Sequence, residues 1–507
     1  MAPNLKVFDR IIEGGLIFII VFTPLAFGAV HVATYTVMEL TVIFLIVLWV
    51  LKLFLVNQKV AERKIEIRYS LLLPFFLFIV LILFQMLPLP PSVIKYLSPN
   101  TYKLYEQTLP SWHSSINSNF INSDNSTNRE VASCKSQVAI QNWMPISIYK
   151  HTTKAELFKI LAYIGVFFLI INNLVTEEQI KRLVVAIIIM GSIIAFLGII
   201  QMASGTDKIY WFWQSVYWKG KPPGFFGTYV NRNHFAGYME MVIPLAIGFL
   251  ISYLPVSSFQ GGSWRARIAS LESRISKNIL FIFVIVLMIA ALFLSLSRGG
   301  IICFLLSILF LVNFLLFYHR RRKRSTAVFL ISIFIVSALF LVWVGISPLL
   351  DRLASLREPD KVSPLRPVVY KDTINIVSDF PLVGTGLGTF EYIYPRYKTV
   401  KTNLFFEHTH NDYLELLSDT GISGTLFLVG GVLLFLIVIM KRWAKRRNPF
   451  VVGMALGGTT GILSILFHST VDFNMHIPAN AMLFFIILAL SYAAVHMRSH
   501  HRETLRH

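Results

Sequence analysis

The sequence predicts an all-α polytopic membrane protein, with about twelve transmembrane helices and a large outer loop between the ninth and the tenth. Its apolar residues come in runs of about 20, the length that crosses a hydrocarbon core of about 30 Å. Hydrophobic residues make up 55% of the 507 residues and charged residues only 14%, whereas soluble proteins carry about a quarter charged residues. Many apolar runs follow the first one, which argues against a cleaved signal peptide.

The apolar runs divide the chain into five segments. Residues 1–88 hold three predicted spans, and residues 89–155 form an outer loop with a Ser- and Asn-rich insertion. Residues 156–346 hold the next six spans, residues 347–420 form the second large outer loop, and residues 421–507 hold three spans and a tail. The twelve runs cover roughly residues 11–30, 35–56, 70–88, 156–175, 182–203, 234–254, 278–296, 299–318, 327–346, 421–440, 450–468 and 478–496.

The net charge of +20 is distributed in a way that excludes nucleic acid as the expected partner. Basic clusters such as Arg265–Lys277, Arg320–Arg324 and Lys441–Arg447 fall in short loops between apolar runs. Short loops rich in Lys and Arg face the cytoplasm and anionic membrane lipid. We therefore expect both termini in the cytoplasm and both large loops outside. Cys134 lies in an outer loop and Cys303 in an apolar run, so the pair predicts neither a disulfide nor a metal site.

The segment 204–233 is unusually rich in aromatic residues, and two interpretations are open. An interfacial aromatic belt is the favoured one, and a stacking surface for sugar rings is the alternative for one or two of the residues. The aromatic residues concerned are Tyr210, Trp211, Trp213, Tyr217, Trp218, Phe225 and Phe226.

The stretch from Glu407 to Leu417 places two histidines and a carboxylate just before a helical pattern. Asn411 or Asp412 can cap that helix. His410 then lies at the positive end of the helix, where the field disfavours an imidazolium ion, so the ring can accept a proton as a general base. Asp412 or Glu407 could orient it. The alternative is that His408 and His410 are ordinary interfacial residues that cap a helix.

Two arginines stand at the outer boundary of predicted spans, against the usual charge distribution. Arg298 lies between two apolar runs with almost no loop, and Arg232 precedes the sixth span. Charges in such places commonly face an interior cavity, and a guanidinium binds phosphate in a two-pronged fork. An arginine that extends to lipid headgroups is the alternative. No metal-ligand cluster accompanies these residues, so we expect chemistry without a metal or other cofactor.

The second outer loop contains further signals. Val369 to Ser378 predicts one helix, and the run Gly384–Gly388 predicts a tight turn that lets backbone approach a ligand or a helix. Glu13, Glu39 and Glu240 lie in apolar spans, where we expect hydrogen bonds between helices. His468, Asp472 and His476 share the last outer loop. They could line the same cavity as the arginines, although an ordinary loop is the favoured interpretation.

Several of these stretches occur in the order found in one family, and the chain resembles the O-antigen ligase and polymerase family of bacterial membrane glycan transferases. The matching motifs are Asn231–Tyr238, Ser297–Gly299, Arg366–Phe390, His410–Asp412 and the helix start at Gly421–Gly424. The likeness covers about residues 180–495 by motif. The long Ser- and Asn-rich insertion departs from the family pattern and leaves the acceptor open.

The resemblance implies transfer of a glycan from undecaprenyl diphosphate to an acceptor at the periplasmic face of the inner membrane. It implies Arg232 and Arg298 as diphosphate contacts and His410 as the base that activates the acceptor hydroxyl. With His408, Asp412 and Arg366 as substrate-binding residues, we expect a single displacement at the anomeric carbon, with inversion.

Three acceptors remain open within this family. A ligase would use lipid A–core, a polymerase another carrier-linked repeat, and a protein glycosylase a serine. A twelve-span transporter is the alternative from a different class. In this sequence the large segments are expected outside and the two halves do not look alike. Both features are unusual for transporters built from repeats.

Overall fold

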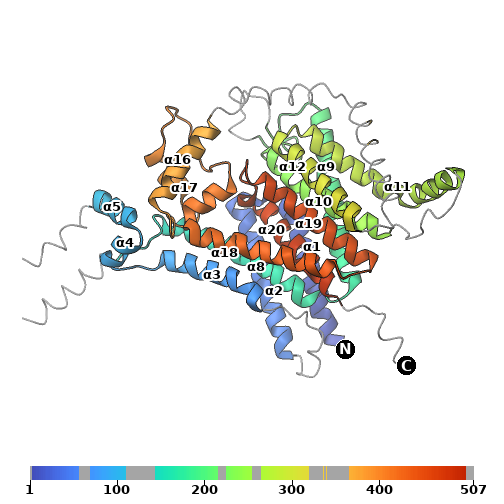
Figure 1. Ribbon diagram of the computed structural model, residues 1–507, viewed down its shortest axis with the longest axis horizontal. Coiled ribbons are helices and arrows are strands. Elements are labelled where there is room, and N and C mark those ends of the chain that lie inside the picture. Colours follow the sequence, from blue (N-terminus) through green and yellow to red (C-terminus); the bar gives the residue numbers. More distant parts are fainter. Residues whose placement is uncertain are drawn as a thin grey trace, which may run out of the picture. The chain divides into compact units, whose positions relative to one another are not determined.

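The computed structural model describes residues 3–55, 69–109, 143–214, 224–253, 264–318, 335, 339 and 365–497. Every regular element among these residues is a helix, and the remaining pairings are isolated β-bridges (Figure 1). The predicted all-α class is therefore confirmed for the part of the chain that the structure describes. The elements are α1 (Pro3–Leu25), η1 (Phe27–Ala29), α2 (Val32–Leu55), α3 (Tyr69–Met86), α4 (Pro91–Leu97), α5 (Pro99–Thr108), α8 (Lys150–Asn173), α9 (Glu177–Ala203), α10 (Arg232–Tyr253), α11 (Trp264–Leu294), α12 (Arg298–Tyr318), α16 (Arg366–Asp379), α17 (Phe390–Tyr397), α18 (Asp412–Trp443), α19 (Pro449–His468), η7 (Asn474–His476) and α20 (Pro478–His496).

The helices support a multi-pass membrane protein. Among the described residues, α2, α8, α9, α10, α18, α19 and α20 are the seven helices long and apolar enough to cross a membrane. Shorter apolar segments occur in α3, α11 and α12. The predicted span 327–346 lies almost entirely outside the described residues. The count of twelve, the position of the large loop and the five predicted segments therefore stay predictions.

The described chain forms two compact units, each assembled from separated stretches of sequence. Unit 1 contains Met1–Ile67, Leu161–Val362 and Phe435–His507. Unit 2 contains Arg68–Ile160 and Ser363–Leu434. Each candidate residue belongs to one of these units.

Helix α10 is the centre of unit 1, where it packs closely against α19 and α20 (Figure 1). Glycines on α19 make this approach possible. A Cβ atom on Gly457 would lie 2.5 Å from the Pro244 carbonyl oxygen of α10, and one on Gly461 would lie 2.6 Å from that of Met241. Small residues at four-residue spacing let apolar helices pack backbone to backbone. This packing fixes the two helix ends that carry Arg232 and His468.

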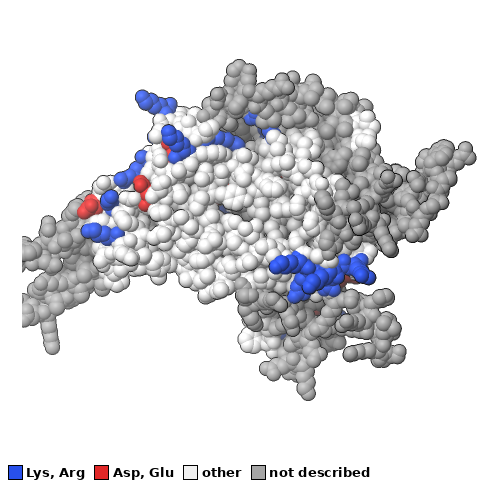
Figure 2. Space-filling model, viewed as in Figure 1, with Lys and Arg blue, Asp and Glu red and all other residues white. Residues whose placement is uncertain are grey.

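The outer helices of unit 1 present apolar side chains to their surroundings. On α2, Leu40 is 60% exposed, and Ile43 and Phe44 are each 55% exposed. Such a continuous exposed apolar face is expected only where lipid covers it. Basic side chains gather instead where α18 ends, among them the exposed Lys441, Arg442 and Arg447 (Figure 2).

Unit 2 packs the short helices of the second large loop on the start of α18. Buried Val369 and Ile376 of α16 pack with Phe390 and Tyr394 of α17. Helix α16 begins at Arg366 and not at the predicted Val369, because Pro367 falls in its first turn. There the missing backbone N–H of proline costs no hydrogen bond.

The glycine run of unit 2 forms the predicted tight turn. Gly384, Gly386 and Gly388 have φ values of 66°, 113° and 75°, which residues with a Cβ atom rarely adopt. The backbone N–H of Gly388 donates to Asp419 Oδ2 at 2.6 Å, and that of Gly386 donates to the Asp419 carbonyl at 2.9 Å. The turn therefore packs directly on α18, which confirms that the glycines allow backbone to approach a helix.

Candidate functional site

His410 occupies a strained turn immediately before α18. It is one of six non-glycine residues with positive φ in the described chain, at 58°. The Tyr370 hydroxyl of α16 donates to the His410 carbonyl oxygen at 2.7 Å and holds the turn in this conformation. Left-handed backbone at a residue with a side chain is costly and tends to occur at functional sites. The fold therefore fixes the direction in which this half-buried imidazole projects.

Arg366 lies against the same ring. Its Nη2 atom is 3.4 Å from His410 Nδ1. Arg366 and Tyr370 are four residues apart on α16, so both project from one helix face. A guanidinium can only donate, so in this contact Nδ1 is the accepting nitrogen.

His408 is anchored by a carboxylate to which the sequence analysis gave no role. Its Nδ1 atom is 2.7 Å from Glu415 Oε1, and Glu415 is only 2% exposed. The other oxygen, Oε2, accepts from the Thr409 backbone N–H at 2.8 Å and from its hydroxyl at 3.2 Å. Glu415 thus reaches back from the first turn of α18 and holds His408 and Thr409 in place. The sequence feature that could have identified Glu415 was its position as an acidic residue in the first turn of a predicted helix.

Asn411 is the cap of α18, which settles one of the alternatives left open above. Its Oδ1 atom accepts from the backbone N–H groups of Tyr413 and Leu414, both at 3.0 Å. This is the usual function of an amide side chain before the first helical turn. Asp412 is the buried first residue of α18. Whether Asp412 or Glu407 orients His410 stays a prediction.

A buried carboxylate connects the two short helices above this turn. Asp372 of α16 is fully buried and accepts from the Tyr394 hydroxyl at 3.2 Å, from the Thr399 hydroxyl at 2.8 Å and from the Thr399 N–H at 3.0 Å. Burial, and secondarily the Asp372 carboxylate, raises the pKa of Tyr394, so the phenol stays a donor. These contacts hold α16, and with it Arg366 and Tyr370, in place. The sequence analysis did not identify Asp372.

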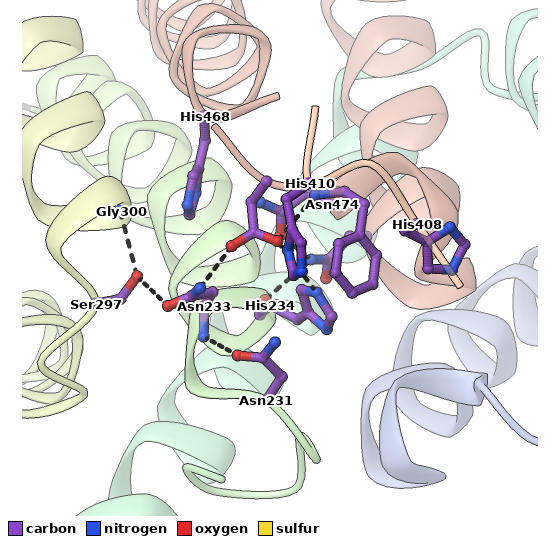
Figure 3. A network of polar contacts seen from close by, with 12 residues as sticks. Asn231, Asn233, His234, Ser297, Gly300, His408, His410, His468 and Asn474 are labelled. Carbon is purple, nitrogen blue, oxygen red and sulfur yellow. Dashed lines mark hydrogen bonds and ion pairs between the residues drawn. The ribbon is translucent and has the colours of Figure 1, made fainter. Parts of the chain in front are cut away.

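In unit 1, a hydrogen-bonded chain links the helix starts that carry the two arginines. Asn233, next to Arg232 on α10, accepts from the Ser297 hydroxyl at 3.0 Å (Figure 3). Ser297 precedes Arg298, and its hydroxyl accepts from the Gly300 N–H at 3.3 Å at the start of α12. On its other side Asn233 donates to Asp472 Oδ2 at 2.5 Å. The backbone positions of Arg232 and Arg298 are therefore coupled through their neighbours.

A buried histidine and carboxylate lie beneath the start of α12. His468 Nδ1 is 3.0 Å from Glu240 Oε1, and both side chains are almost fully buried. This pair connects α19 to α10, as expected for a glutamate in an apolar span. A Cβ atom on Gly299 would lie 2.8 Å from His468 Nε2. The glycine after Arg298 thus provides the space that the imidazole occupies.

The last outer loop is hydrogen-bonded to the start of α10 through Asp472. Asp472 is 1% exposed and accepts from Asn233 and from the Phe473 N–H, and its Oδ1 atom is 3.8 Å from His234 Nε2. Whether this loop lines the same cavity as the arginines stays a prediction. The signal for Asn233 was its position beside an arginine at a helix start, but its partners lie far away in sequence.

The predicted site residues thus fall into two groups. Unit 2 brings His410 and Arg366 into contact, with His408 and Asp412 in the same turn and helix start. Unit 1 holds Arg232 and Arg298 at linked helix starts. The combination of the two groups into one site stays a prediction.

Comparison with known proteins adds one finding. A model of the O-antigen ligase family matches residues 283–429. The match includes Arg298, Arg366 and His410, but it ends before α19 and begins after Arg232. No curated protein matches the chain.

Proposed function

We propose that this protein transfers a glycan from undecaprenyl diphosphate to an acceptor hydroxyl, and the match of residues 283–429 to a model of the O-antigen ligase family supports this proposal. The reaction takes place at the periplasmic face of the bacterial inner membrane. The observation that carries the proposal is the His410 turn, in which a strained backbone and Arg366 present one imidazole nitrogen as a proton acceptor.

His410 acts as the general base through Nδ1. At 3.4 Å the Arg366 contact is long for a hydrogen bond, so an acceptor hydroxyl can replace the guanidinium at that lone pair. The acceptor oxygen attacks the anomeric carbon as its proton moves to Nδ1. The bond from the anomeric carbon to the diphosphate oxygen breaks with its electron pair leaving on the diphosphate, and the configuration inverts.

Arg232 and Arg298 bind the diphosphate and stabilise the negative charge that develops on it as it leaves. Fixed positive groups aimed at developing charge are usually the largest contribution to this kind of catalysis. The Ser297–Asn233–Asp472 chain supports this role, because it fixes the helix starts from which both guanidinium groups project. Displaced Arg366 remains beside the reacting hydroxyl, and His408 and Asp412 complete the acceptor side. No step requires a metal.

The acceptor is lipid A–core in the form of the proposal that we favour, which makes the protein a ligase. The same geometry serves a polymerase that extends a carrier-linked repeat, or a glycosylase that modifies a protein serine. A single assay separates them: purified protein receives one carrier-linked glycan together with each acceptor in turn, and the product shows which acceptor was used.

His410→Ala tests the proposal directly. A positioned general base contributes about 10²–10⁴-fold to the rate, so transfer should fall by at least that lower factor while the carrier lipid still binds. His151→Ala is the matched control, because His151 is an exposed histidine at the start of α8. It should transfer at the wild-type rate.

Near-normal transfer by the His410→Ala variant would remove His410 from the mechanism. Transfer is measured in detergent without any gradient, so product formation also excludes a requirement for transport. A wild-type protein that catalysed counterflow of a labelled solute in proteoliposomes and gave no glycan transfer would instead support the transporter.

A further inference from the structure

Unit 1 contains an exposed aromatic cluster formed by two segments far apart in sequence. Phe27 and His31, between α1 and α2, meet Tyr210 and Trp213, between α9 and α10. The ring centroid of Phe27 lies 5.0 Å from that of Trp213 and 5.6 Å from that of Tyr210. The ring centroids of His31 and Trp213 lie 5.9 Å apart. Phe212 stacks on Tyr210 at 5.9 Å with an angle of 14° between the rings.

Hydrogen bonds lock the two segments together. The Tyr210 hydroxyl donates to the Leu25 carbonyl at 2.6 Å, and the Thr228 hydroxyl donates to the Pro24 carbonyl at 2.6 Å. Burial raises the pKa of Tyr210 to about 12, so its phenol remains a donor. The rings therefore form a rigid surface that exists before any ligand arrives.

The backbone of this cluster is strained. Phe27, Ala29, Tyr210 and Trp211 have φ values of 57°, 58°, 55° and 64°. In the described chain the other non-glycine residues with positive φ are Leu296 and His410, which lie in the turns beside Arg298 and α18. Residues with side chains keep such backbone only where the surrounding structure imposes it, and these positions tend to be functional.

An interfacial belt does not explain these observations. A belt requires only that aromatic rings lie at the level of the lipid headgroups, and it gains nothing from rings that are fixed against one another. Here Phe212 is 74% exposed and stacks on Tyr210, and Trp211 is 45% exposed; the backbone of Tyr210 and Trp211 is strained. Beside them the Gln214 amide donates to Asp207 Oδ2 at 2.7 Å. A rigid ring surface bordered by amide and carboxylate groups is complementary to a sugar.

We propose that Phe27, His31 and Tyr210–Trp213 form a platform on which a pyranose ring of the donor glycan stacks. The C–H face of a pyranose carries slightly positive hydrogens, which are attracted to the negative face of an aromatic ring. Asp207 and Gln214 are placed to hydrogen-bond sugar hydroxyl groups. This inference rests on the proposed function, because it takes the donor to be a glycan on undecaprenyl diphosphate.

The platform packs on the helix that begins at Arg232, within unit 1. Gly28 packs on Tyr229, since a Cβ atom there would lie 3.0 Å from Tyr229 Cε1. Tyr229 in turn packs on Tyr238 of α10 with centroids 5.9 Å apart, and the Arg232 N–H donates to the Gly224 carbonyl in the same loop. The platform and the start of α10 are thus joined through the buried rings of Tyr229 and Tyr238.

The test compares two probes on the full-length protein in lipid nanodiscs. One probe is undecaprenyl diphosphate bearing the glycan of the strain that encodes the protein, and the other is bare undecaprenyl diphosphate. Intrinsic tryptophan fluorescence reports binding. We expect the wild type to bind the glycan-bearing lipid about tenfold more tightly, as a well-stacked ring with accompanying contacts would give.

Phe212→Leu separates a platform from a belt, because leucine is as apolar as phenylalanine but cannot stack on a sugar. The variant should lose the preference for the glycan-bearing lipid and keep its affinity for the bare lipid, and Phe212→Trp should restore the preference. Phe44→Ala, on the exposed face of α2, is the control and should bind both probes as the wild type does.

Three outcomes would overturn the platform: a wild type without preference for the glycan, a Phe212→Leu variant that keeps the preference, or equal weakening by Phe212→Leu and Phe44→Ala. The proposed function can fail separately. In that case the wild type binds neither lipid and transfers no glycan, whereas a failed platform leaves transfer and bare-lipid binding intact.

Discussion

At the scale of single residues, side chains next to the arginines and histidines hold these residues in position. Asn233 and Ser297 share a hydrogen bond of 3.0 Å, and each adjoins an arginine at a helix start. Tyr370 plays a comparable part for His410, since its hydroxyl fixes the strained carbonyl. In the proposed mechanism, neighbouring residues that do not contact the substrate thus hold the residues that do contact it.

Ser297→Ala tests this coupling. It removes the acceptor for the Gly300 N–H and the donor to Asn233, and loss of a serine cap costs about 0.5–2 kcal/mol. We expect a lower thermal unfolding midpoint in detergent and a raised KM for the donor. Ser297→Thr keeps the hydroxyl and should restore the wild-type KM.

Ser307→Ala serves as the matched control on the same helix, because the Ser307 hydroxyl donates to the Phe304 carbonyl three residues earlier. Its donor KM should not change. If Ser297→Ala changes only the unfolding midpoint and leaves the KM at the wild-type value, the coupling to the arginines is wrong.

At the scale of elements, α18 is bent where it leaves the glycine turn. Gly421 has φ 64° and ψ −171° inside the helix, and its α-carbon faces the backbone of Leu382. The Gln85 side chain of α3 donates to the Val383 and Asp419 carbonyls at 2.6 and 2.9 Å and completes the junction. The bend therefore sets the angle between the first turns of α18, which follow His410, and its long apolar part.

Gly421→Ala should destabilise the protein markedly. The added Cβ would collide with the Leu382 backbone, and alanine at this φ and ψ is strained by about 1–3 kcal/mol before any clash is counted. We expect a large fall in the thermal unfolding midpoint and loss of transfer.

Gly430→Ala is the control on the same helix, since no atom lies within 4 Å of the position of its added Cβ. Alanine is a better helix former than glycine by about 1 kcal/mol, so this variant should unfold at the same or a higher temperature. Equal behaviour of the two variants would show that the bend is not needed.

At the scale of the whole molecule, the arrangement of basic loops sets the predicted orientation. The exposed basic residues at the end of α18 form one of the clusters expected in the cytoplasm (Figure 2). The proposed chemistry needs the opposite face, where His410, Arg232 and Arg298 are expected. Orientation is therefore the prediction on which the periplasmic assignment depends.

The two cysteines allow this orientation to be measured. The sequence places Cys134 in an outer loop, whereas Cys303 is buried in α12 and 6% exposed. A membrane-impermeant maleimide added to intact spheroplasts should label one thiol per chain, and Cys134→Ser should abolish the labelling. Buried thiols are unreactive.

A cysteine introduced at Lys445 in the Cys134→Ser background provides the control for the other side. Lys445 is exposed after α18, and this thiol should react only after the membrane is permeabilised. Labelling of Lys445→Cys in intact spheroplasts would reverse the topology and move the proposed site to the cytoplasmic side.

The sequence by itself determined what short-range chemistry can specify. Apolar runs identified helices such as α9 and α20, the glycine run predicted a tight turn, and the pair Asn411 and Asp412 before a helical pattern limited the cap of α18 to two candidates. The motifs in order also indicated the family whose model matches residues 283–429. Each of these signals is contained within a short stretch of sequence, so no three-dimensional contact is needed to detect it.

Only the tertiary structure decided which distant residues meet. Asp472 lies 239 positions from Asn233, Gln85 lies 334 positions from Asp419, and Phe27 packs on Trp213. Residues on one face of a helix or strand recur at short, regular spacings, but these partners lie far apart in the sequence. No local sequence pattern therefore pairs them. Backbone strain is equally hidden, because the φ of His410 or Tyr210 is imposed by contacts made elsewhere in the fold.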